Sequence, residues 1–106
     1  MIDSQATART FSALAHPSRV DIFRCLLAHH PVGLTAGKLA KATALAPSTL
    51  SHHLSEMEMG GVILRRAVGP STVTTLDLQK LNSIAASLMQ ICCSVDAANP
   101  TESETQ

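Results

Sequence analysis

Apolar residues recur every three or four positions through the first half of the chain, the spacing of helices that pack one face on a core. A first helix is predicted over residues 4–15, with Phe11, Leu14 and Ala15 on its buried face. A second helix is predicted over residues 17–29, and two shorter ones follow it. Four helices are therefore expected before the pattern changes.

The fourth of these helices has a polar outer face. Pro47 suits its first position, where a missing N–H does no harm, and Leu50 and Leu54 face inward because they lie four residues apart. Four short polar side chains then point away from the core: Ser48, Thr49, Ser51 and His52. Hydroxyls and imidazoles at the start of a helix can hydrogen-bond base edges and phosphates in a major groove. The segment predicts the recognition helix of a helix-turn-helix.

The pattern then changes to that of strands. Residues 62–66 and 72–76 are predicted to form a hairpin, or wing, around a turn at residues 69–71. Asp77 caps a last helix whose apolar residues are spaced three and four apart, as in a seam for a partner helix. This stripe comprises Leu78, Leu81, Ala85, Leu88 and Cys92. The expected fold is mainly α with a small β-hairpin, a homodimeric winged helix-turn-helix.

The chain is expected to hold one domain. A length of 106 residues supports a single modest core. Residues 1–93 are assigned to a winged helix-turn-helix domain for DNA binding and dimerisation. Residues 94–106 are small, polar and acidic, which predicts a disordered tail.

The net charge is zero but unevenly divided. Residues 1–76 carry seven Lys and Arg against four acidic residues, a charge of +3, and residues 77–106 carry −3. The positive part includes the predicted recognition helix and the wing residues Arg65 and Arg66. Its charge is sparse, so a modest affinity for the phosphate backbone is expected.

Several classes of protein are not expected. No apolar run approaches the roughly 18 residues of a membrane helix, and residues 1–4 lack the features of a signal peptide. A cytoplasmic protein without a membrane partner is therefore predicted. Three cysteines, two of them adjacent, do not make a disulfide framework. No nucleophile–base pair, P-loop or open zinc site is visible, so neither an enzyme nor a required cofactor is expected.

Cys92 and Cys93 are the candidate ligands of the chain. Adjacent thiols at a helix end suit a soft, thiophilic ion better than zinc, which wants four ligands. Two thiols saturate a monomethylated arsenic(III) centre, whereas inorganic arsenite wants a third sulfur. Alternatively, Cys92 packs on the apolar seam. Cys25 is either a buried core thiol, a third ligand or a disulfide partner.

Two histidine pairs are less suited to bind a metal, because adjacent histidines on a helix diverge. His29 and His30 are expected to be a solvated helix end. His52 is expected to contact DNA. For His53, packing inward and contact with a DNA phosphate both remain open.

The order of elements and three motifs resemble those of the ArsR/SmtB-type winged-helix repressors, over roughly residues 9–93. The motifs are FSALAHPSRV at residues 11–20, His52-His53-Leu54, and Gly60-Gly61-Val62. The resemblance implies a homodimer that binds operator DNA and releases it when a metal, metalloid or oxidant occupies a sensor site.

The chain departs from that family in its sensor sites and its wing. Residues 34–39 lack the frequent Cys-x-Cys pair, and residues 78–93 lack the His, Asp and Glu of zinc and nickel sensors. The pair Cys92-Cys93 resembles that of an arsenic-responsive subgroup, which implies a trivalent arsenic or antimony inducer. Beyond Gly69 the wing has no arginine or tyrosine, so Arg65 and Arg66 must supply most of its charge.

The predicted function is a metalloid-responsive transcriptional repressor. Its homodimer is expected to bind double-stranded operator DNA and to dissociate when arsenite, methylarsenite or antimonite binds Cys92 and Cys93. The predicted DNA contacts are Ser48, Thr49, Ser51, His52, His53, Arg65 and Arg66.

Two alternatives remain open. One is a thiol-based redox or persulfide sensor that uses Cys25 with Cys92 or Cys93, although the second-helix cysteine of such relatives falls at the position of Arg24. The other is a winged-helix interaction module without strong DNA binding, suggested by the neutral charge and the weak wing.

Overall fold

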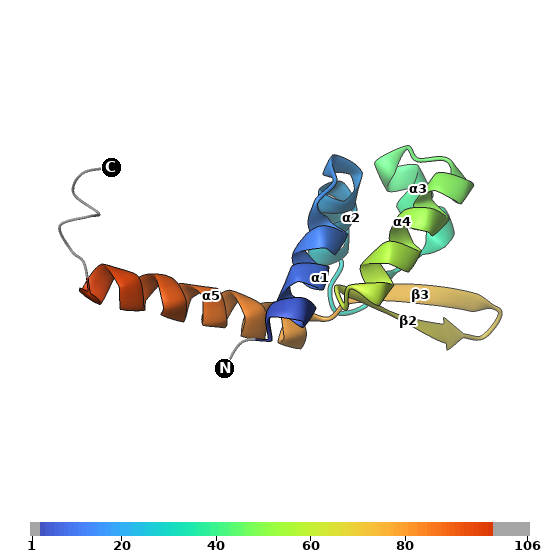
Figure 1. The fold of residues 1–106 in the computed structure, drawn as a ribbon. Coiled ribbons are helices and arrows are strands. Elements are labelled where there is room, and N and C mark those ends of the chain that lie inside the picture. Colours follow the sequence, from blue (N-terminus) through green and yellow to red (C-terminus); the bar gives the residue numbers. More distant parts are fainter. Residues whose placement is uncertain (1–2, 99–106) are drawn as a thin grey trace.

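The structure, a computed structural model, describes residues 3–98 and places four helices beside a small sheet, with a fifth helix extending to one side (Figure 1). The elements are α1 (Ser4–Leu14), α2 (Pro17–Ala28), β1 (Leu34–Thr35), α3 (Ala36–Thr43), α4 (Pro47–Met59), β2 (Ile63–Val68), β3 (Ser71–Leu76) and α5 (Leu78–Ala98). The predicted fold class, mainly α with a winged helix-turn-helix, is confirmed.

The sheet has one strand more than the predicted hairpin. Its order is β1-β3-β2, with both pairs antiparallel, and Leu34 lies opposite Thr74. The added strand is only two residues long, between Gly33 and the start of α3. Such a short segment shows no alternation, and only its pairing with β3 makes it a strand. It anchors the base of the wing to the helix-turn-helix.

The core lies between the helices and the inner face of the sheet. Its buried apolar residues come from the elements α1 to β3 and from Val62 before β2: Ala13, Ile22, Leu26, Leu34, Leu39, Leu50, Leu54, Met57, Val62, Ile63 and Leu76. Three of these belong to α4, so the recognition helix is held by one apolar face while its opposite face remains free.

Of the three residues predicted on the inner face of α1, Leu14 packs on the core, but Phe11 and Ala15 are exposed. Phe11 is 45% exposed, and the helix instead buries Thr7, Thr10 and Ala13. These smaller side chains let α1 approach the end of α4 closely, where Gly60 leaves no room for a side chain. A hydrophobicity pattern cannot show this, because the contact depends on small size rather than on apolar surface.

The helix caps largely follow the sequence. The carboxylate of Asp77 accepts a hydrogen bond from the backbone N–H of Lys80, as predicted, and the hydroxyl of Thr35 accepts one from that of Lys38 at the start of α3. The Nδ1 atom of His16 caps α2 by accepting from the N–H of Ser18, a role that the sequence analysis did not assign.

Helix α5 continues to Ala98, beyond the predicted start of the tail at Ser94. Helix-forming residues such as alanine at positions 97 and 98 are compatible with this extension. The remainder of the predicted tail, residues 99–106, lies outside the described residues. Within residues 3–98, no helix is both long enough and apolar enough to cross a membrane.

Candidate DNA-binding surface

The outer face of α4 carries the predicted base-contacting residues. Ser48, Thr49, Ser51 and His52 are all exposed. On the opposite face, Leu50 and Leu54 are each only 2% exposed. Burial of this leucine pair fixes the rotation of the helix about its own axis. The first two turns of α4 therefore present short hydrogen-bonding groups to the outside.

His53 does not share this face, and its predicted contact with DNA was wrong. Its side chain is only 5% exposed. It packs inward because position 53 lies one turn before Met57, which is fully buried on the same side of α4. Of the two alternatives for His53, the inward one describes the structure.

A hydrogen-bond network surrounds the buried His53 ring. Nε of Arg19, on α2, donates to Nδ1 of His53 at 3.1 Å, and the same guanidinium donates through a terminal nitrogen to the carbonyl of Ser12. The ring centroid of His16 lies 4.7 Å from that of His53. Burial lowers the pKa of His53 below its ordinary value of 6.5, and the nearby His16, Arg19 and His52 lower it further. These contacts join α2 to the recognition helix.

The two wing arginines have different environments. Nε of Arg65 lies 3.3 Å from a carboxylate oxygen of Glu58, at ion-pair distance but without hydrogen-bond alignment, and a terminal nitrogen donates to Ser55 at 3.4 Å. Arg65 therefore connects β2 to α4. Arg66 points to the other face of the strand and is exposed. Within residues 3–98 it has no ion pair, so it offers the freer charge.

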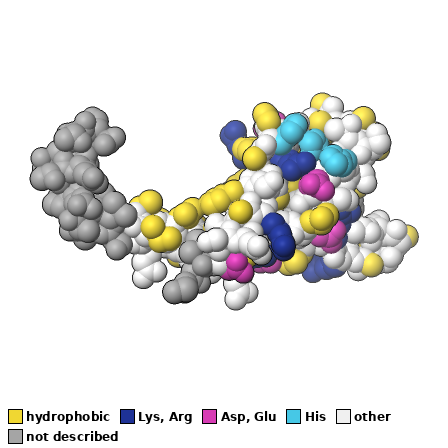
Figure 2. All heavy atoms as spheres, in the orientation of Figure 1, with side chains coloured by type: hydrophobic (Ala, Val, Ile, Leu, Met, Phe, Trp, Pro, Cys, Tyr) yellow, Lys and Arg dark blue, Asp and Glu magenta, His cyan; other side chains and the backbone are white. Residues whose placement is uncertain are grey.

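Charged side chains are mixed on the visible face of the helical body (Figure 2). Histidines lie beside Lys or Arg side chains, with acidic side chains among them. This agrees with the sparse positive charge expected from the sequence, and it means that DNA affinity must depend on a few residues.

The candidate sensor thiols lie far along α5. Cys92 and Cys93 are exposed, and Cys25 is half-buried against the core. All three are free thiols. No group of three metal-ligating side chains occurs within the described part of the chain. Among the side chains that the structure describes, the two adjacent thiols have no third ligand beside them.

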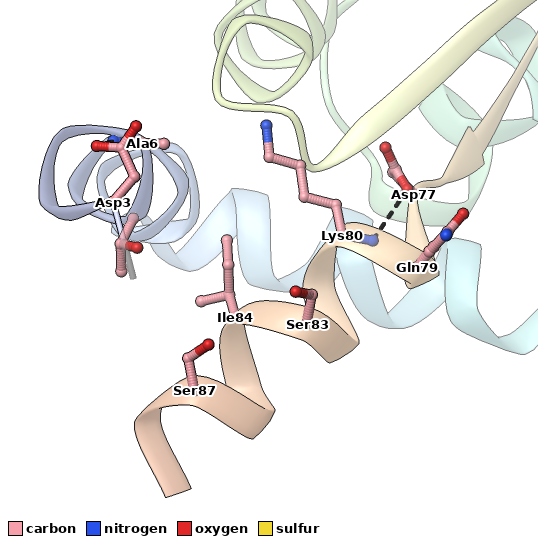
Figure 3. Close-up of a pocket in the computed structure, with 9 residues that line it drawn as sticks. Asp3, Ala6, Asp77, Gln79, Lys80, Ser83, Ile84 and Ser87 are labelled. Carbon is pink, nitrogen blue, oxygen red and sulfur yellow. Dashed lines mark hydrogen bonds between the residues drawn. The ribbon is translucent and has the colours of Figure 1, made fainter. Parts of the chain in front are cut away.

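Helix α5 also carries an apolar surface. Leu78 and Leu81 pack on the core, whereas Met89 and Ile91, farther along, are 67% and 47% exposed. Figure 3 shows a hollow of about 430 Å³ between the start of α1 and α5, toward which Ile84 points. Ile84 was absent from the predicted seam, and Ala85, which was included, is exposed.

Known proteins share the sequence and the architecture of this chain. A family model described as a helix-turn-helix domain matches residues 14–66. The HTH-type transcriptional regulator YgaV of Escherichia coli (strain K12) is 30% identical over 90 residues, which cover 85% of this chain and 89% of YgaV. The chain belongs to the HTH-type transcriptional regulators. Its fold matches an ArsR-like transcriptional regulator from Rhodococcus sp. RHA1 with a TM-score of 0.81 at 21% identity, over 97% of this chain and 94% of the other.

A second solved structure also shares this fold. The homodimeric winged helix-turn-helix DNA-binding domain of Mb0332 from Mycobacterium bovis aligns with a TM-score of 0.68 at 23% identity, over 91% of this chain and 84% of the other. This domain shares the fold of the regulator described here.

Two groups of residues at this surface were missed by the sequence analysis. His16 and Arg19 hold the recognition helix through His53, and Ser55 and Glu58 hold the wing through Arg65. The signal for the second group was available, because both residues lie on the side of α4 nearest the predicted hairpin. No local pattern indicates the first group, which joins residues 34 positions apart.

Proposed function

We propose that a homodimer of this regulator represses transcription by binding operator DNA through α4 and the wing, and that a trivalent arsenical or antimonial releases it by binding Cys92 and Cys93. The observation that carries the DNA-binding part is the orientation of α4. Its four predicted contacts are exposed at the start of the helix, while the neighbouring Leu50 and Leu54 are buried.

The dimer is supported by α5. Only the first part of this helix packs on its own core, and large apolar side chains farther along are open to solvent. Apolar surface of this kind marks an interaction site, and the homodimeric Mb0332 domain has the same fold. Pairing of two protomers through α5 would present two recognition helices to half-sites about one helical turn apart.

The thiol pair supports the choice of inducer. Methylarsenite carries two hydroxyl groups, so two thiols can replace both, forming two As–S bonds and releasing two molecules of water. Arsenite carries three, and would retain one hydroxyl at this site. Since the pair supplies two sulfur ligands, methylarsenite is expected to act at least as well as arsenite.

Release requires that the inducer favour one state of the dimer over the other. Cys92 and Cys93 lie on the same helix as the exposed Met89 and Ile91. Bridging two adjacent thiols distorts the helical turn that holds them. A change at this surface would alter the spacing of the two recognition helices.

The test is a fluorescence-anisotropy titration of the operator complex with methylarsenite, arsenite, antimonite, zinc and a persulfide donor. The Cys92→Ser/Cys93→Ser variant should bind DNA but fail to release it, and Cys25→Ser should respond like the wild type. Full induction of the double variant by methylarsenite would refute the proposed site.

One observation favours a second candidate. Both Cys92 and Cys93 are exposed free thiols, which oxidants and persulfides can also modify. Release by the persulfide donor but not by any metalloid would assign the chain to thiol-based redox sensing, and loss of that response in Cys25→Ser would identify the partner thiol.

A further inference from the structure

We propose that Arg19 and His53 form a proton-sensitive lock that positions the recognition helix, so that operator affinity falls when His53 is protonated. The inference rests on the proposed binding of operator DNA by α4. It concerns a buried residue that contacts no DNA itself and therefore acts as a positioning residue.

The geometry determines the protonation state of His53. The guanidinium of Arg19 is always charged and can only donate hydrogen bonds. Because its Nε donates to Nδ1 of His53 at 3.1 Å, that ring nitrogen must carry a lone pair. The folded state therefore holds neutral His53 with its proton on Nε2.

The surroundings oppose a second proton on the ring. Arg19 of α2 faces His53 directly, the His16 ring lies 4.7 Å away before α2, and the His52 ring lies 5.9 Å away on α4. On the other side of Arg19, Glu56 of α4 and Arg9 of α1 line a surface hollow together with it. The side chain of His53 is buried, and its pKa lies below the ordinary value for histidine.

Protonation would convert the lock into a repulsive contact. An N–H on Nδ1 would then face the N–H of Arg19, with positive charge on both groups. Arg19 can keep its hydrogen bond to the carbonyl of Ser12, but α4 would lose its polar link to α2. The residue affected is adjacent to His52 and one turn from Thr49, so a shift of α4 there moves the base-contacting face.

The sign of the effect separates this mechanism from simple electrostatics. Added positive charge beside DNA would strengthen binding in acid. Opening of the Arg19–His53 lock would instead weaken DNA binding. If DNA binds the neutral form more tightly than the protonated form, a pKa one unit lower in the complex than in the free protein corresponds to about a tenfold loss of affinity below both values.

The experiment measures operator affinity by anisotropy from pH 8 to pH 5.5 at constant ionic strength, for the wild type, His53→Asn and His30→Asn. Asparagine at position 53 retains an acceptor near the place of Nδ1 but does not titrate. Affinity of the wild type and of His30→Asn, an exposed histidine outside this surface, should fall several-fold by pH 5.5, toward a limit of about tenfold. His53→Asn should bind at pH 7.5 and lose this fall.

The variant His16→Asn and an NMR titration of His53 test the lock independently. His16→Asn keeps an N-cap acceptor for α2 and removes a group that lowers the pKa of His53, so the acid transition should move to higher pH. NMR titration of the His53 ring in the wild type should give a lower pKa with operator bound than without. Equal pKa values in both states, or an unchanged pH profile in His53→Asn, would overturn the lock. Absence of operator binding at pH 7.5 would instead refute the proposed function.

Discussion

The hydroxyl of Thr10 donates a hydrogen bond of 2.9 Å to the backbone carbonyl of Gly60, and so ties α1 to the end of the recognition helix. Thr10 is 1% exposed, and its hydroxyl also reaches the carbonyl of Ala6 at 3.2 Å. At the same contact, a Cβ on Gly60 would overlap the methyl group of Ala13. Hydrogen bonding and small size together set the distance between α1 and α4.

Gly60→Ala should therefore destabilise the fold. The added methyl group would push α1 away from α4, which costs about 1–3 kcal/mol for an overpacked site. Thr10→Val should cost a similar amount, about 1–3 kcal/mol, because it leaves the buried carbonyl of Gly60 without this donor. Urea unfolding followed by circular dichroism measures both changes.

Gly37→Ala is the matched control for this prediction. Gly37 lies in α3, and a Cβ there would meet nothing within 4 Å. Alanine should leave stability unchanged or raise it by up to about 1 kcal/mol, since glycine is the weaker helix former. Equal losses at Gly37 and Gly60 would contradict the packing argument.

The two wing arginines should differ in the salt dependence of DNA binding. Arg66 is exposed and free of ion pairs within residues 3–98, whereas Arg65 lies near Glu58. Arg66→Ala should lower the slope of log K against log [salt] by about 0.9, the value for one phosphate contact. Arg65→Ala should change the slope less. A larger slope change for Arg65 would mean that it leaves Glu58 to contact DNA.

Leu88→Asp should disrupt the dimer. Leu88 is half-buried on α5 between exposed apolar neighbours, and a carboxylate there would be buried without a partner when two chains associate. Sedimentation velocity should show monomers, or the chain should become insoluble. Gln90→Asp, at an exposed polar position on the same helix, should leave a normal dimer. A dimeric Leu88→Asp variant would place the interface elsewhere.

The stability of the fold should decrease in mild acid through His53. Its pKa is lowered in the folded state, so between that value and 6.5 the unfolded chain binds more protons. The contribution of His53 is fully present above pH 6.5 and is lost as the pH falls toward the folded-state pKa. The free energy of unfolding of His53→Asn should fall less steeply from pH 7 to pH 5. Parallel curves would show that other groups control the acid sensitivity.

Sequence patterns predicted most of this fold because most of its elements bury apolar residues at regular spacing. The orientation of α4 followed from Leu50 and Leu54, and the cap of α5 from Asp77. The inner face of α1 did not follow, because it depends on Thr10 and on the missing side chain of Gly60. Strand β1 is too short to show a pattern, and only its pairing with β3 reveals it.

The candidate DNA-binding surface was also predictable only in part. Exposed hydroxyls and an imidazole at a helix start can be identified from the sequence alone. The inward position of His53 and the ion-pair distance between Arg65 and Glu58 depend on neighbours from other elements. The role of a titratable residue next to a predicted DNA contact can therefore be assigned only once the fold is known.

The central claim is that the outer face of α4 recognises operator DNA. The most direct test is the dissociation constant of the operator complex for Thr49→Ala/His52→Ala, measured by anisotropy at pH 7.5 beside His30→Ala. Each substitution in the recognition helix should weaken specific binding by about 1–3 kcal/mol, with non-specific DNA little affected, and His30→Ala should bind like the wild type. Undiminished operator affinity in the double variant would contradict the claim and favour an interaction module that does not read DNA.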